Sequence, residues 1–143
     1  MNCLICRGGK YPHDGYKICG ECFERLYHTG EDVREYLKEK FPEGYTYLCE
    51  TYPELVLLLD GVKINNEFAT YLGEDIGGAS IVVQDKALIC YRLGGFNTVI
   101  HEILHYVFRD LELDPNLEER LVRIASEHIS ISAYLPWNFF KTP

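Results

Sequence analysis

The chain has 143 residues, of which 47% are hydrophobic and 25% are charged, a balance typical of a folded globular protein. The formal net charge of −8 disfavours non-specific binding to nucleic acid, which depends on lysine and arginine side chains that neutralise phosphates. The longest apolar run, residues 55–59, is too short to span a bilayer, and the first ten residues lack the apolar core of a secretory signal, so we expect a cytoplasmic protein with no membrane partner.

Four of the six cysteines form two Cys-x-x-Cys pairs near the N-terminus: Cys3 with Cys6, and Cys19 with Cys22. Two such pairs bring four thiolates to one ion, and in an intracellular chain this pattern favours a tetrahedral zinc site over disulfides. Residues 1–28 hold too few apolar side chains for a core of their own, so a structural zinc ion would hold them together. The spacing resembles a zinc ribbon, and we predict a ribbon domain over residues 1–28 and a second domain over residues 29–143.

The second domain is expected to begin with a helix over residues 29–41, because Val33 and Leu37 recur at helical spacing between charged side chains. Thr29, which is followed by acidic residues, suits the first turn of such a helix. The apolar run at 53–59 is compatible with either a buried helical turn or a strand. We therefore predict a helix over residues 29–41 and leave the secondary structure of residues 53–59 open.

Two β-rich runs, residues 80–84 and 87–92, flank a short polar turn and predict a β-hairpin. A helix should follow the hairpin, with Asn97 as its N-cap and an end near Arg109.

A last helix should begin between residues 114 and 116 and end before Pro136. Its inward face is predicted from its apolar side chains: Leu117, Leu121, Val122, Ile124, Ala125 and Ile129. The aromatic tail over residues 137–140 is expected to pack back onto the domain.

The helix predicted after the hairpin carries the sequence VIHEILHYVF over residues 99–108. His101 and His105 are four residues apart, so they lie one turn apart on one helix face and can both reach one ion. With Glu102 beside them they form the His-Glu-x-x-His signature of zinc metallopeptidases, in which the histidines hold zinc and the glutamate is the general base. The alternative is a core helix with two hydrogen-bonded histidines.

The motif, its amphipathic helix and the preceding hairpin resemble the zincin-fold metallopeptidases over roughly residues 78–135. The resemblance implies a small α+β domain and a third protein ligand for the zinc ion. The metzincin pattern would need Gly and His where this chain has Phe108 and Leu111. The gluzincin pattern takes a glutamate from the next helix. We predict Glu118, because it shares a helical stripe with the apolar residues predicted to face inward, and we keep Glu119 as the alternative.

The chain looks like a minimal gluzincin, similar to the ImmA/IrrE-type peptidases and to small phage zincins, because few residues follow His105. That resemblance implies a specific protein or peptide partner as the substrate. The SprT-like proteases also join such a helix to a zinc ribbon, but their ribbon follows the protease and they act at DNA, which the negative charge disfavours. Candidates for stabilising the oxyanion are His128, Tyr106 and Tyr134.

We therefore expect a zinc endopeptidase that holds two zinc ions, one catalytic and one structural. The alternative is a non-proteolytic, zinc-binding regulatory or interaction module on the same scaffold, which the small size of the chain favours. The remaining two cysteines, Cys49 and Cys90, are expected to be buried thiols that behave as small apolar residues. The sequence leaves the oligomeric state open.

Overall fold

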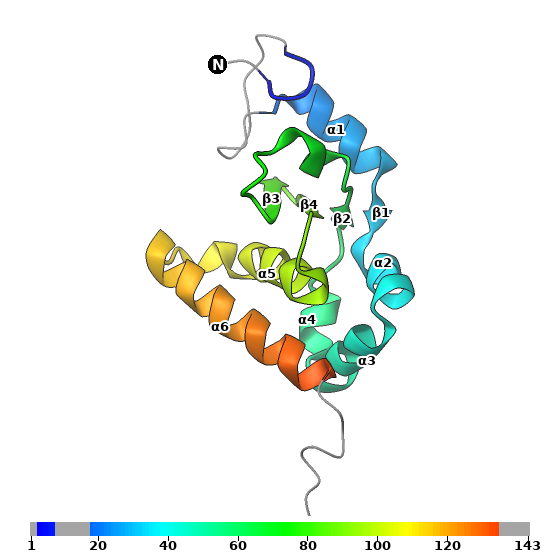
Figure 1. Ribbon diagram of the computed structural model, residues 1–143, viewed down its shortest axis with the longest axis vertical. Helices are drawn as coiled ribbons and strands as arrows, with labels where there is room; N and C mark the ends of the chain where they lie inside the picture. Colours follow the sequence, from blue (N-terminus) through cyan, green and yellow to red (C-terminus); the bar gives the residue numbers. More distant parts are fainter. Residues whose placement is uncertain (1–2, 8–17, 135–143) are drawn as a thin grey trace, which may run out of the picture.

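The chain folds around a small mixed β-sheet of four strands that has helices on both sides (Figure 1). The computed structural model describes residues 3–7 and 18–134. The strands are β1 Glu31–Asp32, β2 Val62–Ile64, β3 Gly78–Val83 and β4 Lys86–Tyr91. The helices are α1 Gly20–Thr29, α2 Val33–Lys40, α3 Pro42–Thr51, α4 Pro53–Leu57, α5 Gly95–Phe108 and α6 Pro115–Tyr134, with 3-10 turns η1 Phe68–Tyr71 and η2 Arg109–Leu111. The predicted α+β class is confirmed.

The strands lie in the order β1-β2-β4-β3, so β3 is an edge strand. β1 pairs with β2 in antiparallel orientation, β2 with β4 in parallel, and β4 with β3 in antiparallel. The last pair is the predicted hairpin, in which Ser80 lies opposite Ile89, and this prediction is confirmed. The hairpin passes directly into α5, which therefore starts at the end of the central strand β4.

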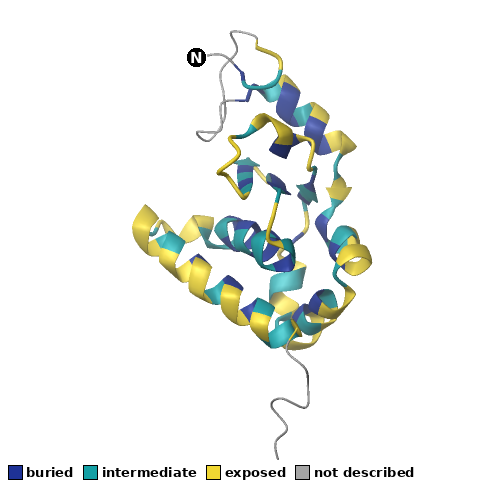
Figure 2. Ribbon diagram, in the orientation of Figure 1, coloured by how far each residue is buried: buried dark blue, intermediate teal, exposed yellow. Residues whose placement is uncertain are grey.

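The central strand β4 contributes side chains to two separate cores, because successive residues of a strand point to opposite faces of the sheet. Ala87 and Ile89 pack in a core with α2, α3, α5 and α6. Leu88 and Cys90 pack in a second core with α1, η1 and the N-terminal cysteines. Cys90 is buried as predicted, whereas Cys49 is exposed on α3, so that part of the prediction is wrong. Figure 2 shows buried residues on both sides of the sheet.

α1 is a helix that the sequence patterns do not predict. It buries Phe23 and Leu26 against the second core. The helix expected over residues 29–41 begins only at α2, where the Asp32 carboxylate accepts a hydrogen bond from the backbone N–H of Arg34 at 2.8 Å. Thr29 ends α1 instead, and its hydroxyl donates back to the carbonyl of Arg25. The boundary at residues 28 and 29 stays a prediction, although both sides of it bury side chains against the same sheet.

The open run at residues 53–59 is helical at its start and forms α4. A proline occupies the first turn of both α3 and α4, where its missing N–H costs no hydrogen bond. None of the helices in the described ranges is long and apolar enough to cross a membrane.

The face of α6 that packs on the domain differs from the predicted one. The buried residues are Val122, Ser126 and Ile129, whereas Leu117, Leu121 and Ile124 are exposed. The prediction that these three side chains face inward is therefore wrong. The apolar side chains of α6 lie on two sides of the helix, and the prediction merged the two. Pro136 and the tail over residues 137–140 lie outside the described residues.

Candidate metal centres

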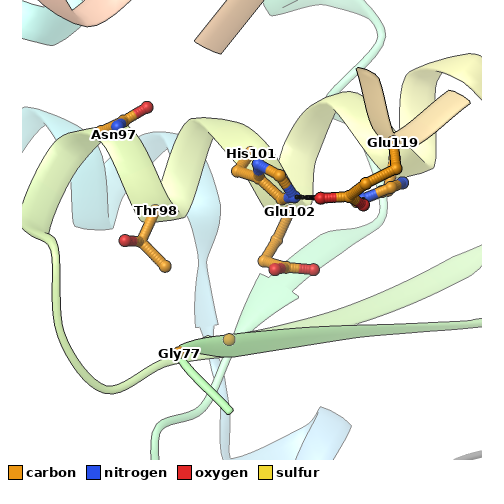
Figure 3. Close-up of a pocket in the computed structure, with 8 residues that line it drawn as sticks. Gly77, Asn97, Thr98, His101, Glu102 and Glu119 are labelled. Carbon is orange, nitrogen blue, oxygen red and sulfur yellow. Dashed lines mark hydrogen bonds and ion pairs between the residues drawn. The ribbon is translucent and has the colours of Figure 1, made fainter. Parts of the chain in front are cut away.

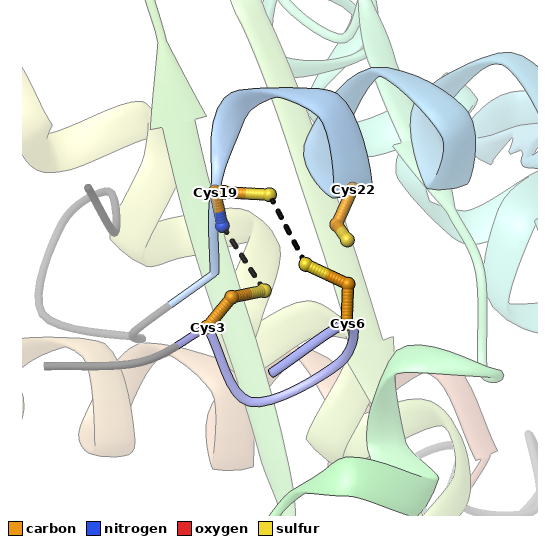
Figure 4. A group of neighbouring side chains, drawn as sticks. All are labelled: Cys3, Cys6, Cys19 and Cys22. Carbon is orange, nitrogen blue, oxygen red and sulfur yellow. Dashed lines mark hydrogen bonds between the residues drawn. The ribbon is translucent and has the colours of Figure 1, made fainter. Parts of the chain in front are cut away.

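The four paired cysteines meet at the start of α1 (Figure 4). Cys3 and Cys6 come from the N-terminal loop, Cys19 is the N-cap of α1, and Cys22 lies in its first turn. Their sulfur atoms lie within 4.8 Å of one another, and the Sγ atoms of Cys6 and Cys19 are 3.8 Å apart. A tetrahedral zinc site with Zn–S bonds of about 2.3 Å has sulfur–sulfur edges of about 3.8 Å. The four residues could therefore hold a zinc-sized ion, as their spacing predicts.

Backbone N–H groups around Cys3 favour its thiolate. The N–H groups of Ile5 and Cys19 point at Cys3 Sγ, with N···S distances of 3.4 and 3.3 Å. Burial raises the pKa of the Cys3 thiol, but these groups and the N–H of Cys6 outweigh burial and lower the pKa to about 6. Burial and the neighbouring sulfur atoms raise the pKa of Cys22 to about 12. Metal binding at this centre would therefore release protons, which Cys22 otherwise retains.

A glycine in the left-handed backbone conformation precedes α5 and determines where the helix begins. Gly94 is the N-cap with φ of +97°, and a Cβ atom there would overlap the hydroxyl of Thr98. Gly95 also has a positive φ, of +58°. Because these two glycines turn the chain, the N-cap of α5 is Gly94, three residues before the predicted one, and the assignment of Asn97 as that cap is wrong. Asn97 instead lies in the first turn, where its Oδ1 is buried with no hydrogen-bond partner among the described residues.

His101, His105 and Glu119 form a second group of ligand atoms (Figure 3). The Nε2 atoms of the two histidines are 3.2 Å apart. Glu119 Oε1 lies 3.2 Å from His101 Nε2, and Glu119 Oε2 lies 3.0 Å from His105 Nε2. A tetrahedral zinc ion with bonds of about 2.0 to 2.1 Å has ligand edges of about 3.3 Å, so these three side chains fit zinc. Burial lowers the pKa of His101, which favours the neutral imidazole that a metal requires.

Glu118, the predicted third ligand, contacts the other side of His105. Its Oε2 lies 2.7 Å from His105 Nδ1, whereas Glu119 faces the Nε2 atoms of both histidines. The stripe of Glu118 includes the buried Val122, and the stripe of Glu119 includes the buried Ser126, so burial along α6 does not separate the two glutamates. A carboxylate that accepts from Nδ1–H fixes the ring and leaves Nε2 free for metal. The geometry thus favours Glu119 as ligand and Glu118 as the group that orients His105.

Glu102 lies beside the three ligand atoms, and its carboxylate points away from α5 toward the start of β3 (Figure 3). Its side chain is almost completely buried, at 7% exposure. Burial raises the pKa of Glu102 to about 7, with a smaller opposing effect from His105. A carboxylate with a pKa near neutrality can both accept and return a proton, which suits a general base.

Two cavities flank the group of ligand atoms, and both are lined by Glu102, His105 and Glu119. The first is about 360 Å³ and is completed by Gly77, Gly78, Asn97, Thr98 and His101. The second is about 540 Å³ and extends past Arg109 and Glu118. The group of ligand atoms therefore borders a cavity on each of two sides.

The three candidates for stabilising an oxyanion do not line either cavity. Tyr106 is buried beneath the guanidinium of Arg109, the hydroxyl of Tyr134 accepts a hydrogen bond from the N–H of Gly44, and His128 is exposed on α6. Asn97 lines the first cavity instead, a position that the sequence patterns did not predict for it. Its spacing of four residues before His101 places it on the histidine face and was the available signal.

No family model, curated protein or solved structure matches the chain.

Proposed function

We propose that the protein is a zinc-dependent endopeptidase of the gluzincin type that cleaves a specific protein partner. One observation carries the proposal: the two histidine Nε2 atoms and Glu119 form three corners of a zinc-sized tetrahedron, and Glu102 lies buried beside them. A simple ion pair would bring a carboxylate to one imidazole, whereas Glu119 reaches the Nε2 atoms of both histidines.

Each side chain has a separate task in the proposed reaction. His101, His105 and Glu119 hold the ion, and Glu118 keeps the His105 ring in place. Zinc, when bound, supplies Lewis-acid chemistry that polarises a carbonyl and lowers the pKa of water. Glu102 accepts the proton of the water that attacks the peptide carbonyl carbon and returns it to the amine nitrogen as the C–N bond breaks.

The four cysteines form a structural centre in this proposal. All four coordination positions are filled by sulfur, which leaves no open position for a substrate. We therefore assign two zinc ions per chain, one at each centre, and only the histidine centre takes part in hydrolysis.

The test replaces Glu102 by Gln in the zinc-loaded full chain. A degenerate library of synthetic peptides is incubated with each variant, and new peptide termini are read by mass spectrometry. The native chain should produce defined fragments, and Glu102→Gln should lower the rate at least about 100-fold while the zinc content stays at two ions per chain. Glu39→Gln, at an exposed position of α2, is the matched control and should cleave at the native rate.

Two results would contradict the proposal. A Glu102→Gln variant with native cleavage would exclude Glu102 as the base. A zinc-loaded native chain that cleaves nothing in the library or in co-purifying proteins would favour the binding module on the same scaffold.

A further inference from the structure

The outer side of α6 carries a stripe of four aliphatic side chains and one histidine. It consists of Leu117, Leu121, Ile124, His128 and Ile131, which we call the α6 stripe. The exposed fractions of its four aliphatic members are 45%, 41%, 66% and 54% in chain order. Figure 2 shows α6 with its exposed residues on the side away from α5. A contiguous row of exposed apolar side chains marks an interaction surface more often than single, scattered apolar side chains do.

The stripe is separate from the face that holds α6 on the domain. Val122, Ser126 and Ile129 pack toward α5 and lie on the opposite side of the helix. Glu119, on that same inner face, reaches the histidines. The inner face alone therefore positions the metal centre, and the stripe contributes nothing to it. This independence means that the stripe needs an explanation of its own.

The spacing of the stripe is that of a coiled-coil seam. Its members follow one another at intervals of four, three, four and three residues, which places them at alternating a and d positions of a heptad. Two heptads are short for an isolated coiled coil. Here, however, α6 is already folded against α5, so association would not bear the cost of ordering the helix.

We propose that the α6 stripe is the interface of an antiparallel homodimer, in which two copies of α6 pack across a two-fold axis. In antiparallel pairs an a position packs against a d position. The axis would pass between Leu121 and Ile124, so that Leu121 faces the partner's Ile124 and Leu117 faces the partner's His128. A two-fold interface uses the same patch on both copies, and a single self-complementary stripe meets that requirement.

The charges beside the stripe select this arrangement. Arg120 and Glu127 occupy the two g positions, and both are exposed with no ion pair to the described residues. With the axis between Leu121 and Ile124, Arg120 faces the partner's Glu127, and symmetry forms the pair twice. A shift by one heptad would place Arg120 against Arg120 or Glu127 against Glu127. A parallel pair would set both charges against the uncharged e positions, Ala125 and Ser132. Opposite charges therefore meet only in the proposed register.

The test measures the mass of the zinc-loaded full chain by sedimentation over roughly 5 to 200 µM, a range that covers weak dimers. The native chain should approach twice its mass of 16.5 kDa. Ile124→Asp should remain a monomer throughout the range, because the dimer would bury two unpaired carboxylates at its centre. Leu57→Asp, at an exposed apolar position of α4 (75% against 66% for Ile124), is the matched control and should dimerise as the native chain does.

A charge exchange tests the register. Arg120→Glu and Glu127→Arg should each weaken association about tenfold, because each replaces two attractive pairs by two repulsive ones. The double variant should restore native association. A native chain that is monomeric at the highest concentration overturns the proposal, as does a dimer that Ile124→Asp leaves intact. A chain that dimerises only after removal of residues 135–143 also overturns it, since the tail would then be the native cover. A double variant as weak as the single ones would overturn the antiparallel register.

Discussion

At the scale of single residues, Gly78 leaves room for the side chain of Glu102. A Cβ atom at position 78 would lie 3.0 Å from Glu102 Oε2 and 2.9 Å from the carbonyl oxygen of Cys90. The backbone oxygen cannot move without disturbing the pairing of β3 with β4, so Glu102 would have to shift. The space that glycine leaves is therefore part of what positions the carboxylate.

We predict that Gly78→Ala lowers the rate of peptide cleavage about 100-fold, since displacement of a catalytic group by about 1 Å has effects of that size. It should also lower the free energy of unfolding by about 1 to 3 kcal/mol through overpacking, measured by denaturant titration. Gly77→Ala is the matched control, because a Cβ atom there meets nothing within 4 Å, and its unfolding curve should match that of the native chain. Equal effects of the two changes would show that Gly78 does not restrict Glu102.

The residues of the histidine centre that lie close together in the sequence could be predicted from it. His101, Glu102 and His105 belong to one helix, and a spacing of four places both imidazoles on one face whatever surrounds the helix. The start of that helix could not be predicted from Asn97, because two glycines with positive φ determine it. A favourable cap residue does not reveal that the chain has already turned.

At the scale of elements, α6 shows why the third ligand was harder to predict. The phase of a helix is inferred from its apolar residues, and this inference fails when apolar residues lie on two faces. The exposed Leu121 moved the inferred inward face toward Glu118 and away from Glu119. Two adjacent glutamates differ by 100° around the helix, so a modest error in phase exchanges their roles.

We predict that Glu119→Ala weakens zinc binding at the histidine centre more than Glu118→Ala does. Loss of a carboxylate that only orients a ligand costs about 10- to 100-fold in affinity, and loss of the ligand itself should exceed that. The measurement is competition against a chelator of known affinity, with the cysteine centre kept saturated. A larger effect of Glu118→Ala would restore Glu118 as the ligand.

At the scale of the whole molecule, the sheet separates two cores, and one candidate metal centre lies beside each core. α5 and α6 cover one face and carry the two histidines and the two glutamates, respectively, and α1 and the cysteine loop cover the other. The Cys-x-x-Cys spacing predicted that the four sulfur atoms would meet. It could not predict that α1 packs on the hairpin, because contacts between segments this far apart leave no periodic signal in either one.

We predict that the six thiols react in three stages. In the zinc-loaded chain only the exposed Cys49 should react quickly. Chelation should release the four clustered cysteines, which the proposal assigns to a zinc ion. Burial raises the pKa of Cys90 to about 12, so about one thiol in 10,000 is ionised at pH 8 and it should react only after denaturant is added. The count of labelled cysteines by intact mass checks this order. If chelation alone exposes Cys90, the core of the sheet depends on the cysteine zinc.

The two-sided strand β4 also bears on how the chain can be divided. A fragment that begins at residue 29 would keep the histidine helix and both glutamates, yet it would leave Phe68, Ile81 and Leu88 without their cover from α1. Such a fragment would present an apolar sheet face to other molecules and would be prone to aggregation. The cysteine segment thus forms one side of the second core, and the smallest unit that can be produced and studied is the segment and the histidine helix together.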